Sequence, residues 1–380
     1  MAFEFIAEQL AQQKLAHRLR QRQCIAEQQG AKLFYQNKEY LNFSSNDYLG
    51  LNQHPEINDA FHEGIRKFGA SSCSSSLVTG FSYAHQVLEN TVCEWLNKPR
   101  CLLFNSGFSA NHGVLHALAT DQTQFWLDKL SHASLIDGAF SGKAKVKRFL
   151  HNNYDQLEQL LMQKKLPNNL IVSEGVFSMD GDRADVNALQ NIAKKYDSWL
   201  YLDDAHSLGV IGDKGQGSTS INPDIDIVMA TFGKAVATSG AFIACNEELH
   251  DFLINFSRHY IYSTAMSPAN AWATNKSIEI IQREHWRREK IAELSALFSS
   301  TLDPEIELIP TSSSIHAIVI GDELKALEIA QKLKAKGIWL TAIRPPTVPN
   351  GTSRLRVTIS ASHNLQDIKS LAENINKVIH

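Results

Sequence analysis

The sequence contains no uninterrupted apolar run close to the roughly 20 residues that a transmembrane helix requires. It also lacks an excess of charge, because 37 basic and 40 acidic residues leave a net charge of −3. Such a balance produces no strong field that would attract nucleic acid or an anionic membrane. We therefore expect no nucleic acid and no membrane among its partners.

Cysteine is also scarce. The five residues form no CxxC pair and no zinc-ligand spacing: Cys24, Cys73, Cys93, Cys101 and Cys245. A small, odd and scattered set predicts reduced thiols and no metal site. Residues 1–8 carry acids where a signal or transit peptide would be basic. These features together predict a cytoplasmic location.

What the sequence does contain is an alternation of short apolar runs and helical patterns between about residues 45 and 265. A chain of 380 residues is long enough for two domains. The alternation predicts an α/β fold whose mostly parallel sheet is covered by helices. The predicted strands are 100–104, 124–127, 146–149, 170–173, 199–202, 226–230 and 240–244, with a helix at 185–195 among the connections.

The regions on either side follow other patterns. A surface helix through Arg22 and a hairpin of 32–35 with 39–43 predict an N-terminal arm. One long helix, 268–299, is predicted to connect to a smaller α+β domain made of strand 316–320, helix 323–336, strand 338–343, strand 355–359 and helix 365–378. The predicted domain ranges are therefore 1–44, 45–267 and 268–380.

Two motifs carry the chemistry. Asp203 and His206 follow the apolar run 199–202, and Lys234 follows a second run 31 residues after Asp203. Open α/β sheets bind ligands at the carboxyl ends of their strands. A carboxylate, an imidazole and a lysine there are the parts of a pyridoxal phosphate site, in which the lysine forms a Schiff base and the acid holds the pyridine nitrogen protonated. Each motif alone is also typical of an ordinary solvated loop.

Three further polar clusters follow predicted strands. Gly107 and Phe108 open a helix, whose N-terminus suits a phosphate. His132 stands at a strand–helix junction, and Glu174 and Ser178 follow another strand. Singly, these groups are more often helix caps or solvent-bonded side chains, but their repetition at successive strand ends indicates one site.

These motifs resemble those of the α-oxoamine synthases, a branch of the fold-type I pyridoxal phosphate enzymes. The resemblance runs from about Leu19 to His363 and rests on residues 41–50, 174–182, 203–206, 231–234 and 341–349. It implies a large cofactor-binding domain, a smaller C-terminal domain and a homodimer. One departure lies at residues 69–77, where serines and Cys73 replace glycines common in the family.

The resemblance implies catalytic roles for Lys234, Asp203, His206 and His132, and a cofactor contact for Ser178. Lys234 carries the cofactor as a Schiff base, and Asp203 pairs with the pyridinium nitrogen. His206 and Ser178 bond the phenolic oxygen side of the ring, and His132 stacks on its face. Because adjacent strand side chains point to opposite faces, we expect Asp203 rather than its neighbour Asp204 to reach the cofactor.

The same resemblance implies the remaining cofactor contacts. Gly107, Phe108 and Thr231 hold the phosphate or its surroundings. Glu174 lies near the ring oxygen, and Thr264 reaches the phosphate of the partner subunit.

Substrate contacts are implied as well. Asn46 and Arg356 bind the amino-acid carboxylate, for which a guanidinium offers a bidentate geometry. Arg20 and Thr347 contact the acyl thioester, and His132 also borders the substrate.

The implied reaction is the decarboxylative condensation of L-alanine with a pimeloyl thioester of coenzyme A or of an acyl carrier protein. Residues 341–349 favour this pair of substrates over the glycine- or serine-using siblings. Three alternatives remain: such a sibling, an aminotransferase on the same fold, and a scaffold that has lost its chemistry. The presence of Lys234, Asp203, His206 and His132 argues against the last.

Overall fold

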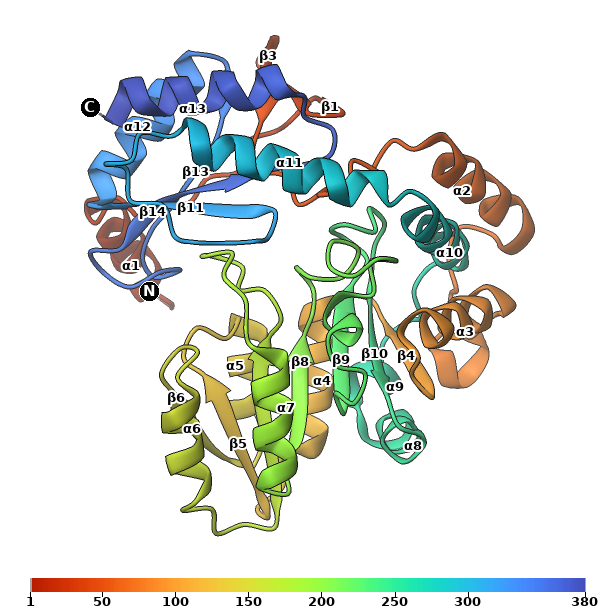
Figure 1. The fold of residues 1–380 in the computed structure, drawn as a ribbon. Helices are drawn as coiled ribbons and strands as arrows, with labels where there is room; N and C mark the ends of the chain where they lie inside the picture. Colours follow the sequence, from red (N-terminus) through yellow and green to blue (C-terminus); the bar gives the residue numbers. More distant parts are fainter. Residues whose placement is uncertain (1, 380) are drawn as a thin grey trace. The chain divides into compact units, whose positions relative to one another are not determined.

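The computed structural model describes residues 2–379, so Met1 and His380, the outermost residues of the predicted ranges 1–44 and 268–380, lie outside it. The chain forms two compact units (Figure 1). Unit 1 comprises residues 1–45, 179–181 and 290–380, and unit 2 comprises residues 46–178 and 182–289. This division differs from the predicted ranges, because the N-terminal arm groups with the C-terminal residues and residues 268–289 group with the large unit.

Unit 2 is built on a seven-stranded sheet that matches all of the strands predicted there. Strand β10 runs antiparallel to both of its neighbours, and the other pairs are parallel. The order is β4 (Arg100–Phe104), β10 (Ala241–Cys245), β9 (Ile227–Thr231), β8 (Trp199–Asp203), β7 (Asn168–Glu174), β5 (Thr123–Asp128) and β6 (Lys145–Phe149). The central strands are buried on both faces, which explains their continuous apolar sequences.

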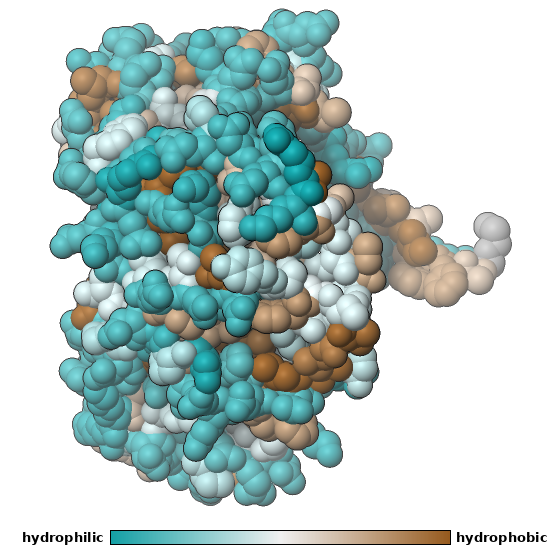
Figure 2. Space-filling model, turned by 90° about the vertical axis from the view of Figure 1, so that its right-hand side faces the viewer, coloured by the Kyte–Doolittle hydropathy of each residue, from teal (hydrophilic) through white to brown (hydrophobic). Residues whose placement is uncertain are grey.

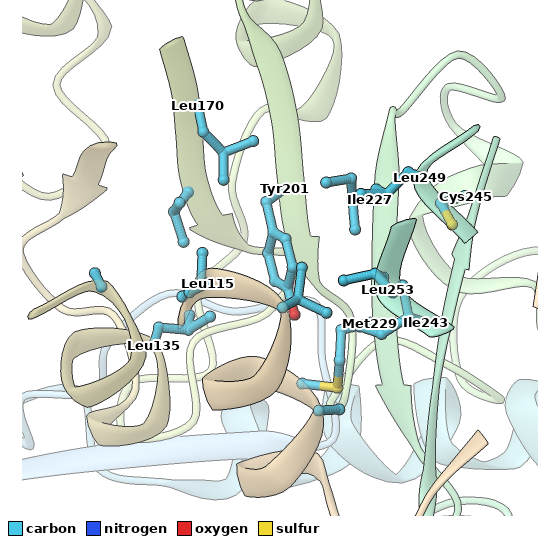
Figure 3. Packing of buried hydrophobic residues seen from close by; sticks show 14 of the residues in the cluster. Leu115, Leu135, Leu170, Tyr201, Ile227, Met229, Ile243, Cys245, Leu249 and Leu253 are labelled. Atoms are coloured by element: carbon cyan, nitrogen blue, oxygen red, sulfur yellow. The ribbon is translucent and has the colours of Figure 1, made fainter. Parts of the chain in front are cut away.

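Helices cover both faces of this sheet. Helix α7 (Val186–Lys195) lies over one face, and α4 (Gly107–Leu118) and α5 (Ala133–Phe140) lie over the other (Figure 1). Figure 3 shows Tyr201 and Met229 of the sheet packed with Leu115 of α4 in a buried core. The other helical segments of unit 2 are α2 (Pro55–Phe68), η1 (Ser76–Gly80), α3 (Tyr83–Leu96), α6 (Tyr154–Leu161), η2 (Gly217–Ser220), α8 (Glu247–Phe256), α9 (Arg258–Ile261) and α10 (Pro268–Arg283).

The prediction of a single helix over 268–299 is wrong. The structure has two helices there, and they pack in different hydrophobic cores. Helix α10 ends at Arg283, where Glu284 leaves helical geometry, and α11 (Trp286–Thr301) follows. Helix α10 packs closely on α2: a Cβ atom on Gly64 would lie 2.8 Å from Ala269 Cα. Residues of α11 such as Phe298 instead belong to the core of unit 1. An apolar stripe alone does not reveal that its two halves face different cores.

Unit 1 contains two small sheets. The first has the order β1 (Glu27–Gln29), β2 (Lys32–Tyr35), β3 (Lys38–Asn42), β12 (Ile338–Trp339), and the second β11 (Ile315–Gly321), β14 (Ser353–Thr358), β13 (Thr341–Ile343). The predicted strand 338–343 is therefore two strands that pair in different sheets. The predicted helices are α12 (Glu323–Ala335) and α13 (Leu365–Ile379), and both contribute to a core around Leu355 and Val357.

The N-terminal helix is shorter than predicted. Helix α1 (Phe5–Leu15) ends before His17, which adopts a left-handed φ of 54°. The next residue, Arg18, forms an ion pair in which its Nη2 lies 2.6 Å from Glu323 Oε1. No residue of α1 is buried, and Phe3 and Leu15 are 71% and 81% exposed.

Within residues 2–379, every helix is too short or too polar to cross a bilayer. The face in Figure 2 is mainly hydrophilic, with separate hydrophobic areas.

Candidate active site

The carboxyl ends of three parallel strands in unit 2 bring the central residues together. Glu174 ends β7 and pairs in register with Asp203 at the end of β8, which in turn pairs with Met229 of β9. Lys234 follows three residues after β9 ends at Thr231. The strand register therefore gathers groups that lie 60 residues apart in the sequence.

A chain of hydrogen bonds links the lysine to the start of unit 2. Lys234 Nζ lies 2.9 Å from His206 Nε2, and the other ring nitrogen of His206 lies 2.5 Å from the Tyr48 hydroxyl. That hydroxyl also donates to Asn46 Oδ1 at 3.2 Å. Because a phenolic hydroxyl has one hydrogen, a Tyr48 that donates to Asn46 can only accept from His206, which fits the tautomer with the hydrogen on Nδ1. Two predicted site residues, His206 and Lys234, are thus in direct contact.

Asp203 is 5% exposed and is held by two donors. Asn111 Nδ2 donates to Asp203 Oδ2 at 2.8 Å, and the Ala205 N–H donates to Oδ1 at 3.0 Å. Asn111 is fixed in turn, because its Oδ1 accepts from the buried Tyr201 hydroxyl at 2.6 Å. These bonds fix the plane of the carboxylate at the strand end.

Asp204 points into a different environment and is fully buried. It accepts hydrogen bonds from both the backbone N–H and the hydroxyl of Ser218, at 2.8 and 2.6 Å. Burial raises its pKa, while the bonds from Ser218 oppose that rise. The carboxylate of Asp204 therefore organises the loop that holds Ser218.

His132 and Glu174 form another pair at this edge. The backbone N–H of His132 donates to Glu174 Oε1 at 2.6 Å, and His132 Nδ1 lies 2.7 Å from the Ser134 hydroxyl. Burial raises the pKa of Glu174 well above its usual range, and the charge of Asp203 adds to this. Burial also lowers the pKa of His132, which favours a neutral ring that can stack on another ring.

A cradle lies where α4 begins. The first N–H groups of a helix have no partner within the helix, and they suit a phosphate. A Cβ atom on Gly107 would lie 2.6 Å from Thr231 Cγ2, so only glycine fits there without a shift. The Thr231 hydroxyl oxygen is buried and has no hydrogen-bond partner among the described residues. Phe108, the next residue of α4, is 46% exposed.

Thr264 lies beside this cradle through its backbone. Its carbonyl accepts from Asn105 Nδ2 at 2.7 Å, and it forms an isolated bridge with Ser75 of the serine-rich loop. The hydroxyl of Ser72 in that loop donates to the Met266 carbonyl at 2.6 Å. The Thr264 side chain itself is exposed. The loop 71–76 is thus bonded to residues 264–266 of the same chain.

The remaining predicted substrate residues lie in unit 1, apart from Asn46. Arg20 Nη2 donates to the Thr347 hydroxyl at 3.2 Å, so these two residues are neighbours although 327 positions separate them. Arg356 is 9% exposed on β14, the central strand of its sheet, and donates to the Thr358 hydroxyl at 3.1 Å. Arg356 is therefore buried on a central strand and is not a surface residue of an edge strand.

Ser178, a predicted cofactor residue, lies in unit 2, four residues after the end of β7.

These residues fit pyridoxal phosphate. The unpartnered Thr231 hydroxyl and the opening of α4 at Gly107 offer donors for its phosphate. Asp203 offers a buried carboxylate for a protonated ring nitrogen, and Lys234 offers a primary amine.

Sequence reasoning assigned no role to two residues that complete this arrangement, Tyr48 and Asn111. Asn111 is a buried amide in a helix whose other buried residues are apolar or glycine, and it follows Gly107 by one helical turn. That mismatch is a usable signal, because a buried amide needs a partner. Tyr48 stands in an irregular segment without periodicity, so only the fold reveals its contact with His206.

Comparisons with known proteins show the family to which the chain belongs. A family model described as "Aminotransferase class I and II" matches residues 38–375. The chain is 46% identical to an 8-amino-7-oxononanoate synthase from Photobacterium profundum, covering 95% of this chain and 93% of the relative. It is also 46% identical to one from Vibrio atlanticus, covering 95% and 89%.

Solved structures give the same picture. A serine palmitoyltransferase from S. paucimobilis with a bound PLP–myriocin aldimine has a TM-score of 0.92 at 27% identity, covering 99% of this chain and 97% of that one. An 8-amino-7-oxononanoate synthase from Francisella tularensis has a TM-score of 0.78 at 27% identity, covering 89% and 97%. The predicted fold class is confirmed. The chain belongs to the class I and II aminotransferase family and, within it, to the 8-amino-7-oxononanoate synthases.

Proposed function

We propose that this chain condenses L-alanine with a pimeloyl thioester, with loss of carbon dioxide, to form 8-amino-7-oxononanoate for biotin biosynthesis. It is a pyridoxal phosphate-dependent acyltransferase. The observation that carries this function is the contact of Lys234 with His206 beside Asp203, in a chain 46% identical to synthases of that name. The acyl group arrives on coenzyme A or on an acyl carrier protein.

Each residue of unit 2 has a defined task. When bound, pyridoxal phosphate supplies an electron sink for the bonds at the amino-acid Cα. Lys234 holds the cofactor covalently through Nζ, and after release it moves the proton at Cα. His206 orients the lysine by a hydrogen bond, because its Nε2 lies 2.9 Å from Lys234 Nζ. The ring is held in turn by the Tyr48 hydroxyl, 2.5 Å from Nδ1. Asp203, fixed by Asn111, keeps the ring nitrogen protonated.

The remaining residues bind and orient. His132 stacks on the ring face, while Glu174 and Ser178 lie at the ring-oxygen side. Gly107, Phe108, Thr231 and, from the partner subunit, Thr264 hold the phosphate.

Substrate binding involves charge and shape. Arg356 and Asn46 bind the carboxylate of alanine, Arg356 through the parallel N–H donors that a guanidinium offers to a planar anion. Arg20 and Thr347, joined by a 3.2 Å hydrogen bond, contact the acyl thioester.

One alternative has a specific observation in its favour. The serine palmitoyltransferase structures have TM-scores up to 0.92, so a sibling reaction with serine or glycine fits the same fold. Turnover with alanine, glycine and serine, each offered with pimeloyl and longer acyl thioesters, separates the two. We expect alanine with the pimeloyl thioester to give the highest kcat/KM, with release of carbon dioxide. A preference for serine with a long acyl chain would overturn the assignment.

We also propose that the working unit is a cytoplasmic homodimer with sites shared between subunits. Large apolar side chains of unit 2 are exposed, including Phe108 of the cradle at 46%, Val78 at 75% and Tyr262 at 72%. A partner would cover such side chains. Mixing an inactive Lys234→Ala chain with a Thr264→Ala chain should restore part of the activity, since a hybrid dimer contains one intact site. A fully active monomer in sedimentation at the assay concentration would refute sharing.

A further inference from the structure

His151 lies between two carboxylates at the same strand-end edge of unit 2 as the active site. Its Nδ1 lies 3.0 Å from Asp128 Oδ1 and its Nε2 lies 2.7 Å from Asp182 Oδ2. Asp128 ends β5, His151 follows β6 by two residues, and Asp182 lies in the loop after β7. One imidazole therefore joins the loops that follow three neighbouring strands.

The protonation state of His151 follows from its partners. Ionised carboxylates are acceptors only, so both ring nitrogens must donate, and a neutral imidazole carries only one N–H. Asp128 is fully buried, whereas His151 and Asp182 have side chains 25% and 22% exposed. The bonds to the two carboxylates outweigh burial and raise the pKa of His151 to about 9. At neutral pH the group is an imidazolium between two carboxylates.

The two acids are connected to predicted cofactor residues. Asp128 Oδ1 also accepts the N–H of Leu130 at 2.8 Å, and this fixes the short turn that leads to His132. The carbonyl of Asp182 accepts the N–H of Phe177 at 3.0 Å, beside Ser178. The ring of Phe177 packs edge-on against His151 with centroids 4.3 Å apart.

Asn152 completes the connection. Its backbone N–H donates to Asp128 Oδ2 at 3.0 Å, and its side-chain amide donates to Asp182 Oδ2 at 2.9 Å. The nearby Tyr154 donates to the Asn152 side chain at 3.1 Å, and its own pKa of about 12 keeps it neutral. Among residues 2–379, the charged groups that hydrogen-bond to the imidazole are the two acids.

We propose that His151 is a positioning residue, an ionic clamp that holds the loops carrying His132 and Ser178 in the geometry that the cofactor ring requires. This role depends on the proposed function only because that function places His132 and Ser178 against the cofactor. Loss of the clamp releases two loops at once and leaves a buried carboxylate, Asp128, without its cation.

The test compares full-length variants that differ in one charge. His151→Gln removes the cation but keeps one donor, and Asp182→Asn removes one of the two acids. His250→Gln is the matched control, since His250 pairs with Asp251 at 3.0 Å on helix α8. The first readout is the affinity of the cofactor-free chain for pyridoxal 5'-phosphate, followed by fluorescence quenching. We expect His151→Gln to weaken binding about 10- to 100-fold, Asp182→Asn less, and the control within about twofold.

The second readout is the histidine 13Cε1 NMR signal of His151, assigned by its loss in His151→Gln. We expect it to titrate near pH 9 and to move to lower pH in Asp182→Asn. In turnover, His151→Gln should lower kcat about 10- to 100-fold and leave the KM for the acyl thioester within about twofold. If His151→Gln does not fold, the cofactor affinity of Asp182→Asn, compared with that of His250→Gln, decides: an affinity equal to that of the control overturns the clamp.

Wild-type cofactor affinity in His151→Gln, or titration of His151 near its ordinary value, overturns the clamp. The cofactor affinity and the NMR titration involve neither alanine nor a thioester. A failure of the proposed reaction with a normal clamp is thus distinguishable from a failure of the clamp itself.

Discussion

Asp203 and Asp204 are adjacent acids with different surroundings, and replacing each by asparagine separates catalysis from stability. Asp204 is fully buried, and both of its oxygens accept hydrogen bonds from Ser218. An amide of the same size keeps one acceptor and turns an NH2 group toward a donor. The bond lost is worth about 1.5–3 kcal/mol when it involves a charged group. Asp204→Asn should therefore destabilise unit 2 by about 2 kcal/mol.

For a unit of roughly 240 residues, that free energy corresponds to a fall in Tm of about 4–8 °C. Asp203→Asn removes the negative charge that faces the cofactor nitrogen, and loss of a preorganised electrostatic partner costs about 10²–10³-fold in kcat. Below both unfolding midpoints, Asp204→Asn should keep its kcat within about tenfold of the wild type.

The assay is steady-state turnover at a temperature below both midpoints, combined with calorimetry of each variant without cofactor. Ser218→Ala is the matched control for Asp204, because it removes the 2.6 Å bond while leaving the acid in place. Equal losses of kcat in the two asparagine variants would refute the reasoning, as would an Asp204→Asn chain with an unchanged Tm.

Three further outcomes follow from other contacts. Lys234→Ala should abolish turnover and leave no borohydride-reducible bond between protein and cofactor; an adduct at another lysine would contradict its role. Arg356→Ala should raise the KM for alanine at least tenfold with little change in that for the thioester, and the reverse pattern would place Arg356 at the acyl site. Burial lowers the pKa of His316, whose ring nitrogens have no partner among the described residues, to about 4. Above the ordinary histidine pKa of about 6.5, His316 is neutral in both states and the folded chain keeps its full stability. As the pH falls from there toward 4, the unfolded chain binds a proton that the buried ring does not, so the free energy of unfolding decreases. His316→Leu should reduce the loss of urea resistance between pH 7 and 4.5, whereas the exposed control His285→Gln should not; identical slopes in wild type and His316→Leu would exclude this cause.

The sheet of unit 2 could be predicted because its strands are short apolar runs buried on both faces. Runs such as 199–202 and 240–244 lie within one or two residues of β8 and β10. The approximate position of the site followed as well, since Asp203 and Lys234 come at strand ends, where a parallel sheet gathers its loops. Which residue follows a strand can be read directly from the sequence, without knowledge of the fold.

Tertiary packing decided the rest. Nothing local distinguishes the two halves of the pattern 268–299, which end in different hydrophobic cores, or strand 338–343, whose two parts pair in different sheets. The contacts of Tyr48 with His206 and of Asn111 with Asp203 join residues 158 and 92 positions apart. A side chain's partner across such a distance depends on strand register and on the angle at which helices pack. Both are set by the whole fold, because the free energy that selects them is shared among all of the buried residues.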